Sequence, residues 1–213
     1  MTIDLKKVDP GISPDPDNLN SEVWGREISF SLPNKYLISA ESGAGKSSLI
    51  SFIYGERKGY EGDIVLNGLS AKTMTDDQWT GMRRNNLSLV FQGLKLFPEL
   101  TALENIQLKN KLTDYYTESQ IAELFDVFGL KHKMNEPAGL LSFGQRQRVA
   151  IIRALSQPFK WMLLDEPFSH IDEANIKIAC DLIIKELTDR KAGMVLTSLG
   201  NRYSMAYDHV YNL

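Results

Sequence analysis

Short apolar runs bounded by turn residues alternate along this chain with longer stretches of helical periodicity. Residues 27–32 (EISFSL) alternate apolar and polar side chains like a half-buried strand, and residues 35–40 (KYLISA) predict a second strand. Similar patterns predict further strands at 62–68, 87–91, 161–167, 193–198 and 208–213, and helices at 46–54, 100–108, 119–130, 142–155 and 173–187. Strands that alternate with helices predict an α/β fold with a mostly parallel sheet.

The pattern changes in the middle of the chain. Between Phe97 and Gly139 the apolar residues have helical spacing and no β-rich run separates them, so a helical insertion is expected there. Near the N-terminus, residues 9–22 (DPGISPDPDNLNSE) are rich in Pro, Asp and Asn and predict an irregular segment.

Composition limits the choice of function. The 213 residues are 43% hydrophobic and 24% charged, which suits a globular domain with a substantial core. The formal net charge of -3 lacks the basic excess of a nucleic-acid binder, so we expect no nucleic-acid partner. The single cysteine, Cys180, is expected in the core, and no secretory signal or apolar run of about 20 residues is present.

The candidate chemistry begins with a glycine-rich loop between a predicted strand and a predicted helix. Residues 40–48 (AESGAGKSS) fit the phosphate-loop pattern G-x-x-x-x-G-K-[ST] except at Ala40. Gly43 and Gly45 can adopt positive φ, while Lys46 would reach the β- and γ-phosphates and Ser47 would face Mg²⁺. The alternative is a simple turn that opens a helix. The whole loop forms the candidate nucleotide site: Ala40, Glu41, Ser42, Gly43, Ala44, Gly45, Lys46, Ser47 and Ser48.

A buried-strand pattern, WMLLDEP, ends in two carboxylates at 165 and 166. The carboxyl ends of strands are where α/β sheets bind ligands, so Asp165 could hold Mg²⁺ through water. Glu166 would lie nearer the γ-phosphate and polarise the attacking water. An acidic turn without function is the alternative, and the phosphate loop upstream makes it the weaker one.

The stretch LLSFGQRQRVAIIRAL begins a helix with a strong N-terminal signal. Ser142 and Gln145 have the S-x-x-Q spacing of a capping box. The stretch also resembles the L-S-G-G-Q signature of ABC ATPases, with Phe143 in place of the first signature glycine. Together with the phosphate loop and the DE carboxylates, it makes the chain similar to an ABC ATPase from about residue 27 to the end.

The resemblance implies a P-loop NTPase fold: a mostly parallel RecA-like sheet with antiparallel β elements and an inserted helical subdomain. It implies one ABC ATPase domain, with residues 1–92 and 157–213 as nucleotide-binding core and about 93–156 as the helical signature subdomain. SLVFQ resembles the Q-loop, which makes Gln92 a Mg²⁺ ligand and sensor, and SHID resembles the D-loop, in which Asp172 would contact the opposite phosphate loop.

The resemblance further implies ATP and Mg²⁺ as cofactors and two subunits that enclose two ATP molecules, as a homodimer or paired with another ATPase. Ser142, Gly144 and Gln145 would meet the nucleotide held by the other subunit, where a helix N-terminus offers amide donors. The partners would be transmembrane permease subunits, which places the protein peripherally on the cytoplasmic face of a membrane. The compact size and LTALENI look most like the lipoprotein-release, macrolide-export and cell-division group.

Two departures from the family pattern matter. Family members carry an adenine-stacking aromatic upstream of the phosphate loop, but residues 14–18 here read PDPDN, and Trp24, the next aromatic, is expected to pack in the core. The family's switch histidine is replaced by Ser198, so Gln92, Glu166 and Ser198 stand in the catalytic positions.

These observations leave three hypotheses for the function. The first is an ATPase subunit that powers a membrane transporter through ATP-dependent dimerisation. The second is a nucleotide-gated module that closes on ATP but hydrolyses it slowly, because Ser198 lacks the charge of histidine. The third is a soluble ABC protein of ribosomes or iron–sulfur assembly; the members that act on ribosomes normally carry two ATPase domains in one chain, which 213 residues cannot hold. Steady-state ATPase activity with and without a membrane partner separates the first two.

Overall fold

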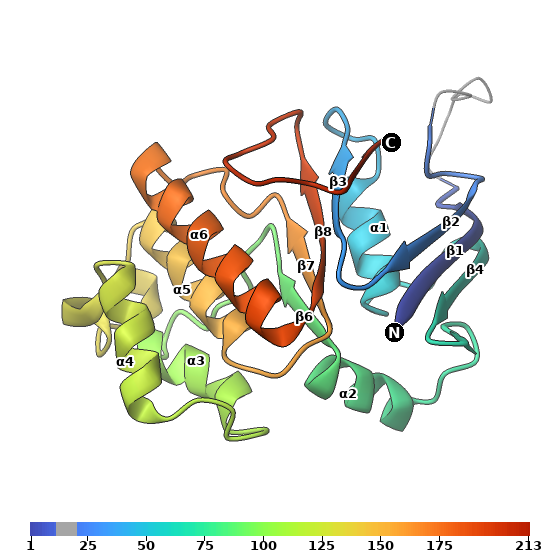
Figure 1. Cartoon of the computed structure of the whole chain (residues 1–213). Helices are drawn as coiled ribbons and strands as arrows, with labels where there is room; N and C mark the ends of the chain where they lie inside the picture. Colours follow the sequence, from blue (N-terminus) through green and yellow to red (C-terminus); the bar gives the residue numbers. More distant parts are fainter. Residues whose placement is uncertain (12–20) are drawn as a thin grey trace.

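The computed structural model describes residues 1–11 and 21–213 and contains two β-sheets and six α-helices in that part of the chain (Figure 1). The strands are β1 (Thr2–Asp9), β2 (Glu27–Ser31), β3 (Lys35–Ser39), β4 (Glu61–Leu66), β5 (Leu69–Ser70), β6 (Leu87–Val90), β7 (Trp161–Asp165), β8 (Gly193–Ser198) and β9 (His209–Asn212). The helices are α1 (Lys46–Ile53), α2 (Asp76–Asn85), α3 (Ala102–Asn110), α4 (Glu118–Val127), α5 (Phe143–Leu155) and α6 (Glu173–Arg190), with short 3₁₀ turns at Lys131–Lys133 and Ala138–Leu140.

The central sheet has the order β6-β7-β8-β3-β9, and every neighbouring pair in it is parallel. Its register pairs Asp165 with Thr197 and Ser39 with Ser198, all at carboxyl ends of strands. The loops that follow β3, β7 and β8 therefore leave the sheet at one edge. The predicted mostly parallel α/β fold is confirmed.

Side chains of the central strands alternate between two cores. In β7, Trp161 and Leu163 pack into the core that contains α1, whereas Met162 and Leu164 pack into the core that contains α5 and α6. Figure 1 shows α1 on one side of these strands and α5 and α6 on the other. Because both faces are covered, the strand is apolar throughout and its sequence shows no alternation.

A second sheet, antiparallel with the order β2-β1-β4-β5, lies beside α1 (Figure 1). Sequence analysis did not predict β1, because its charged residues hid the pattern. Ile3 and Leu5 are buried two positions apart, and the register with β4 shifts between Lys6 and Asp9. That irregularity brings Val8 into the core out of step with a simple alternation.

The described chain between β6 and β7 is helical, as predicted, and α3 and α4 pack on α5. Thr101 and Thr117 begin α3 and α4 with capping boxes that the sequence analysis did not single out. Helix α2 was also missed, although Thr75 and Gln78 form the same motif at its start. It is polar and buries only Trp79, so it has too few apolar residues to stand out in the sequence.

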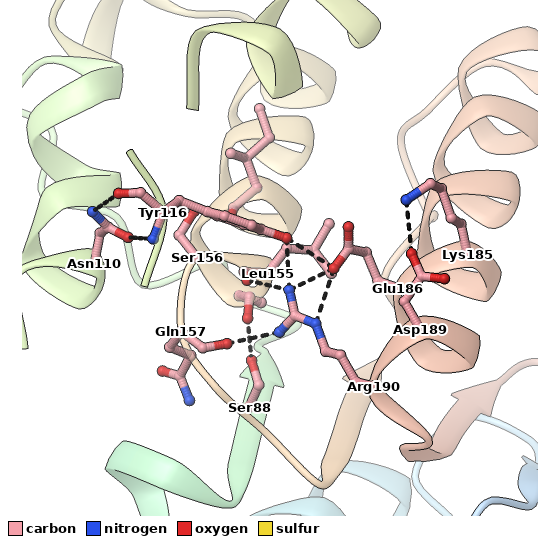
Figure 2. A network of polar contacts seen from close by, with 12 residues as sticks. Ser88, Asn110, Tyr116, Leu155, Ser156, Gln157, Lys185, Glu186, Asp189 and Arg190 are labelled. Atoms are coloured by element: carbon pink, nitrogen blue, oxygen red, sulfur yellow. Dashed lines mark hydrogen bonds and ion pairs between the residues drawn. The ribbon is translucent and has the colours of Figure 1, made fainter. Parts of the chain in front are cut away.

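A closed polar network joins the end of α6 to the helical segment (Figure 2). Arg190 pairs with Glu186 at 2.6 Å and also donates to the Tyr116 hydroxyl at 2.7 Å. The same guanidinium donates to the carbonyls of Leu155 and Gln157 at the end of α5. Helices α5 and α6 and the α3–α4 connection are thereby held together.

Among the described residues, no helix has the length and apolar character needed to cross a membrane.

Candidate nucleotide site

The glycine-rich loop runs from the end of β3 to the start of α1. Gly43 and Gly45 have φ of 85° and 94°, as predicted, a conformation that a side chain would strain. Ala40 does not have positive φ, so its methyl group is tolerated where the pattern expects glycine. No side chain caps α1, and its first backbone amides are therefore available to an anion.

Lys46 opens α1 and is almost completely buried, with 4% of its surface exposed. Its Nζ donates to the loop carbonyls of Ala40 at 3.0 Å and Glu41 at 2.7 Å. It also lies 3.3 Å from a carboxylate oxygen of Glu166, in the loop after β7, a strand that β8 separates from β3 in the sheet. The charge of Lys46 thus points into the space that the loop surrounds.

The two carboxylates after β7 differ in surroundings. Asp165 is buried, and burial raises the pKa of its carboxyl, while hydrogen bonds from Ser47 and Thr197 act in the opposite direction. Glu166 has φ of 45°, a strained value for a residue with a side chain. Strain of this kind persists only where neighbouring contacts impose it, and such residues concentrate at functional sites.

Thr197 supplies part of that constraint and was not among the predicted site residues. It is fully buried at the end of β8, where its hydroxyl donates to Asp165 at 2.9 Å and accepts from the amide of Glu166 at 3.3 Å. The sequence signal was the threonine of VLTS, which stands just before the position where the family has histidine.

Gln92 connects the loop to the carboxylate. Its Oε1 accepts from the Ser47 hydroxyl at 3.2 Å and its Nε2 donates to Glu166 at 3.4 Å. With Asp165 on the other side of Ser47, three oxygen-bearing side chains of the predicted Mg²⁺ set converge on one point. Hydroxyl, amide and carboxylate oxygens are ligands that suit Mg²⁺, so the donor set fits this ion.

Ser198, in the position of the missing histidine, is fully buried. Its hydroxyl donates to the carbonyl of Asn201 at 2.7 Å, and its own carbonyl accepts from the amide of Ala40 at 3.2 Å. The side chain therefore braces the loop after β8. In this conformation its proton is engaged with the backbone.

The signature residues form a second group with the D-loop. Ser142 caps α5 and forms the predicted capping box with Gln145. A methyl group on Gly144 would come within 2.7 Å of the His170 carbonyl, so this position requires glycine. The Phe143 ring lies 4.2 Å from that of His170, and Asp172 caps α6. Among the described residues, no hydrogen bond or ion pair joins this group to Lys46, Ser47, Gln92 or Glu166.

Trp24 supports the phosphate loop from outside the sheet. Its indole N–H donates to the carbonyl of Ala44 at 3.2 Å, and a methyl group on Gly45 would lie 3.1 Å from its ring. It also contacts Phe52 edge-on, which agrees with the expected packing role. The predicted lack of an adenine-stacking aromatic concerns residues 14–18, which lie outside the described residues.

A phosphate loop, an adjacent acidic strand end and a parallel sheet with helices on both faces define a P-loop nucleoside triphosphatase. The comparisons make the class specific. Residues 26–169 match the family model for ABC transporter ATP-binding domains. This chain belongs to the ABC transporter family, as the signature indicated, and it is an ATP-binding subunit of the ATPase class.

Two curated relatives show the range of the family around this chain. The lipoprotein-releasing system ATP-binding protein LolD of Novosphingobium aromaticivorans is 31% identical over 81% of this chain and 78% of its own length. The methionine import ATP-binding protein MetN of Lactobacillus acidophilus is 35% identical over 85% of this chain, which spans about half of that relative (53%).

Solved structures agree on the fold. The dimeric structure of MJ0796, a bacterial ABC transporter cassette, superposes with a TM-score of 0.77 at 28% identity over 92% of this chain and 87% of that one. A dimeric structure of the same cassette in a post-hydrolysis state, bound to ADP and phosphate, gives a TM-score of 0.75 at 25% identity, again over 92% of this chain and 87% of that one.

Proposed function

We propose that this chain drives a membrane permease by pairing with a second ATPase subunit across two bound ATP molecules and hydrolysing them. The separation of the two groups of motif residues carries the proposal. Lys46 and Glu166 form one group at the edge of the sheet, whereas Ser142 and Gly144 form another with the D-loop, and among the described residues no hydrogen bond or ion pair joins the two groups. A second subunit would bring its signature helix N-terminus to the γ-phosphate, where free amides favour an anion.

Within one site, each residue has a distinct task in this proposal. Lys46 exchanges the carbonyls of Ala40 and Glu41 for phosphate oxygens, and the loop amides bind the remaining oxygens. Ser47, Gln92 and Asp165 would hold Mg²⁺, which neutralises phosphate charge when bound. Glu166, held by Thr197 and Gln92, orients the attacking water and accepts its proton.

Two finer features also belong to the proposal. Residues 93–156 would act as the helical subdomain that carries the signature, with residues 1–92 and 157–213 as the nucleotide-binding core. The permease would hold the protein on the cytoplasmic face of the membrane. The relatives serve different transport systems, so the proposal stops at the class of transporter and names no cargo.

A nucleotide-gated module with slow hydrolysis is the second candidate. The observation in its favour is Ser198, whose buried hydroxyl donates to Asn201. Two such subunits would dimerise when ATP binds, and the dimer would separate mainly when the nucleotide exchanges, without hydrolysis. Steady-state turnover separates it from the first candidate.

The experiment that tests nucleotide binding is the Lys46→Ala variant, measured by isothermal titration with ATP and Mg²⁺. Loss of a charge-assisted phosphate contact should weaken ATP binding by at least about tenfold. Lys185→Ala is the matched control, because Lys185 is exposed on α6 and pairs only with Asp189 among the described residues. Equal affinity in all three proteins would mean that the loop is structural and would overturn the proposal.

A further inference from the structure

A hollow of about 260 Å³ lies beside the C-terminal end of α1, away from the phosphate loop. Its wall comes from the end of α1, the loop before β4, the residues after β5, and α2. Six side chains define it: Phe52, Arg57, Lys58, Tyr60, Lys72 and Trp79. None of them belongs to the nucleotide site described above.

The charges around this hollow are all positive. Among the described residues, Arg57, Lys58 and Lys72 line it, and no carboxylate does. Among the described residues none of these three cations forms an ion pair. Arg57 lies over the Phe52 ring at 5.6 Å and Lys72 over the Tyr60 ring at 5.2 Å, contacts that leave their positive charge uncompensated.

Two carboxylates close in sequence to the lining residues have polar partners of their own. Glu56, next to Arg57 in the chain, pairs with Lys95 at 3.1 Å. Asp63 accepts a hydrogen bond from Ser70 at 2.7 Å, on the sheet that flanks the hollow. A concave surface with three cations and no lining counter-charge attracts an anion, because the walls concentrate the field.

The remaining wall is aromatic, from Phe52, Tyr60 and Trp79. Trp79 is 3% exposed, and its indole N–H is buried without an acceptor among the described residues. Buried donors of this kind normally have a partner. Rings along the wall favour a planar, apolar part in the ligand, and the volume suits one substituted ring better than a nucleoside triphosphate.

We propose that this hollow binds a small aromatic anion, a single ring that carries a carboxylate or phosphate group. The anionic group would lie among Arg57, Lys58 and Lys72, and the ring would pack on the aromatic wall. Binding of the anion to this hollow does not depend on ATP binding or hydrolysis at the nucleotide site.

One contact connects the hollow to the phosphate loop. Arg57 Nη1 donates to the hydroxyl of Ser48 at 3.0 Å, and Ser48 is buried two positions after Lys46. An anion that draws Arg57 into the hollow would release Ser48 at the first turn of α1. The ligand should therefore change ATP affinity, and ATP should change ligand affinity by the same factor. This second part rests on the proposed function.

The test is isothermal titration of the full chain with phenyl phosphate in the absence of nucleotide. We expect saturable binding that weakens at least about tenfold in Arg57→Ala/Lys72→Ala, since two charge-assisted contacts are lost. Lys131→Ala/Lys185→Ala removes the same charge from exposed positions elsewhere and should bind like wild type. Equal weakening in both double variants, or binding that never saturates, would overturn the site.

Three further arms identify where and what is bound. Lys46→Ala should keep phenyl phosphate affinity, and a loss there would place the anion in the phosphate loop instead. Benzoate and inorganic phosphate measure the parts played by ring and charge, and inorganic phosphate binding as tightly as phenyl phosphate would overturn the aromatic requirement. Failure of ATP to bind, with phenyl phosphate binding intact, would contradict the proposed function and leave this site standing.

The coupling arm repeats the ATP titration at saturating phenyl phosphate. The ATP dissociation constant should shift at least about threefold in wild type and stay constant in Arg57→Ala/Lys72→Ala. An unchanged ATP affinity in wild type, with the anion bound, would overturn the link through Ser48.

Discussion

Two buried ion pairs in this protein look alike by distance and exposure, yet they have opposite characters. Lys46 and Glu166 lie 3.3 Å apart with side chains 4% and 13% exposed, and Arg190 and Glu186 lie 2.6 Å apart with 8% and 13% exposed. The Arg190–Glu186 pair belongs to a larger hydrogen-bonded network. Its guanidinium also donates to a hydroxyl and two carbonyls (Figure 2). It lies 4.2 Å from the centroid of the Phe159 ring.

The Lys46 pair lies instead where loops from three strands meet. Its lysine is bonded only to loop carbonyls and Glu166 among the described residues, and Glu166 is held at positive φ. Beside it, burial raises the pKa of Asp165. Burial and pairing therefore do not identify a functional site. A functional site is indicated instead by backbone strain, by side-chain oxygens that converge on one point, and by a position at the carboxyl ends of the parallel strands.

The largest expected effect tests the structural half of the comparison. Arg190→Leu should lower the free energy of unfolding by about 3–5 kcal/mol, because Glu186 would remain buried without its partner. Urea denaturation measures the change. Lys185→Ala, in an exposed pair on the same helix, should cost less than about 1 kcal/mol. Equal effects of the two substitutions would contradict the distinction between a buried network and a surface pair.

The next effect tests the catalytic half. Glu166→Gln keeps the shape of the side chain but removes the carboxylate that accepts a proton. We expect kcat for ATP hydrolysis to fall by about 10²–10³-fold, with ATP affinity and unfolding free energy nearly unchanged. A variant that unfolds as readily as Arg190→Leu would assign this pair to stability as well.

The same variant should accumulate an ATP-bound dimer, visible by size exclusion at saturating ATP and Mg²⁺. A monomer there would leave two causes: a requirement for the permease, or obstruction by Phe143, whose ring packs on His170 at 4.2 Å. Adding Phe143→Gly separates them. Dimer formation only in the double variant assigns the block to the ring.

Much of this site could be predicted from sequence because its residues occur in short local patterns. The phosphate loop, the DE pair and the signature each lie within one segment, and the ends of β3 and β7 bring the first two to one edge of the sheet. Strand β1 was missed because charged residues and a register shift interrupt its alternation, and α2 because a polar helix that buries one tryptophan has few apolar residues.

Thr197 shows a different limit. Its place in VLTS, just before the family's histidine position, was visible in the sequence, but its role arises from pairing across the sheet with Asp165. Arg190 is similar, since the hydroxyl and the two carbonyls to which it donates belong to segments 33 to 74 positions away in the chain. Contacts of this kind depend on the fold as a whole, which local patterns do not encode.

The smallest expected effect concerns Ser198, which stands between the two halves of the comparison. Its hydroxyl is buried against the carbonyl of Asn201, like a structural group, although we predict that it occupies a catalytic position. Removing one transition-state donor typically costs about 10²–10³ in rate, so Ser198→His should recover at least about tenfold in kcat. KM should change little, because Lys46 and the loop amides bind the ground-state phosphates.

Ser198→Asn is the matched control for size, and steady-state kinetics at fixed Mg²⁺ and salt compare all three proteins. Fast turnover by the natural serine form, with no gain from histidine, would mean that another group stabilises the transition state. His170 of the D-loop, exposed beside the signature helix, would then be the next residue to replace.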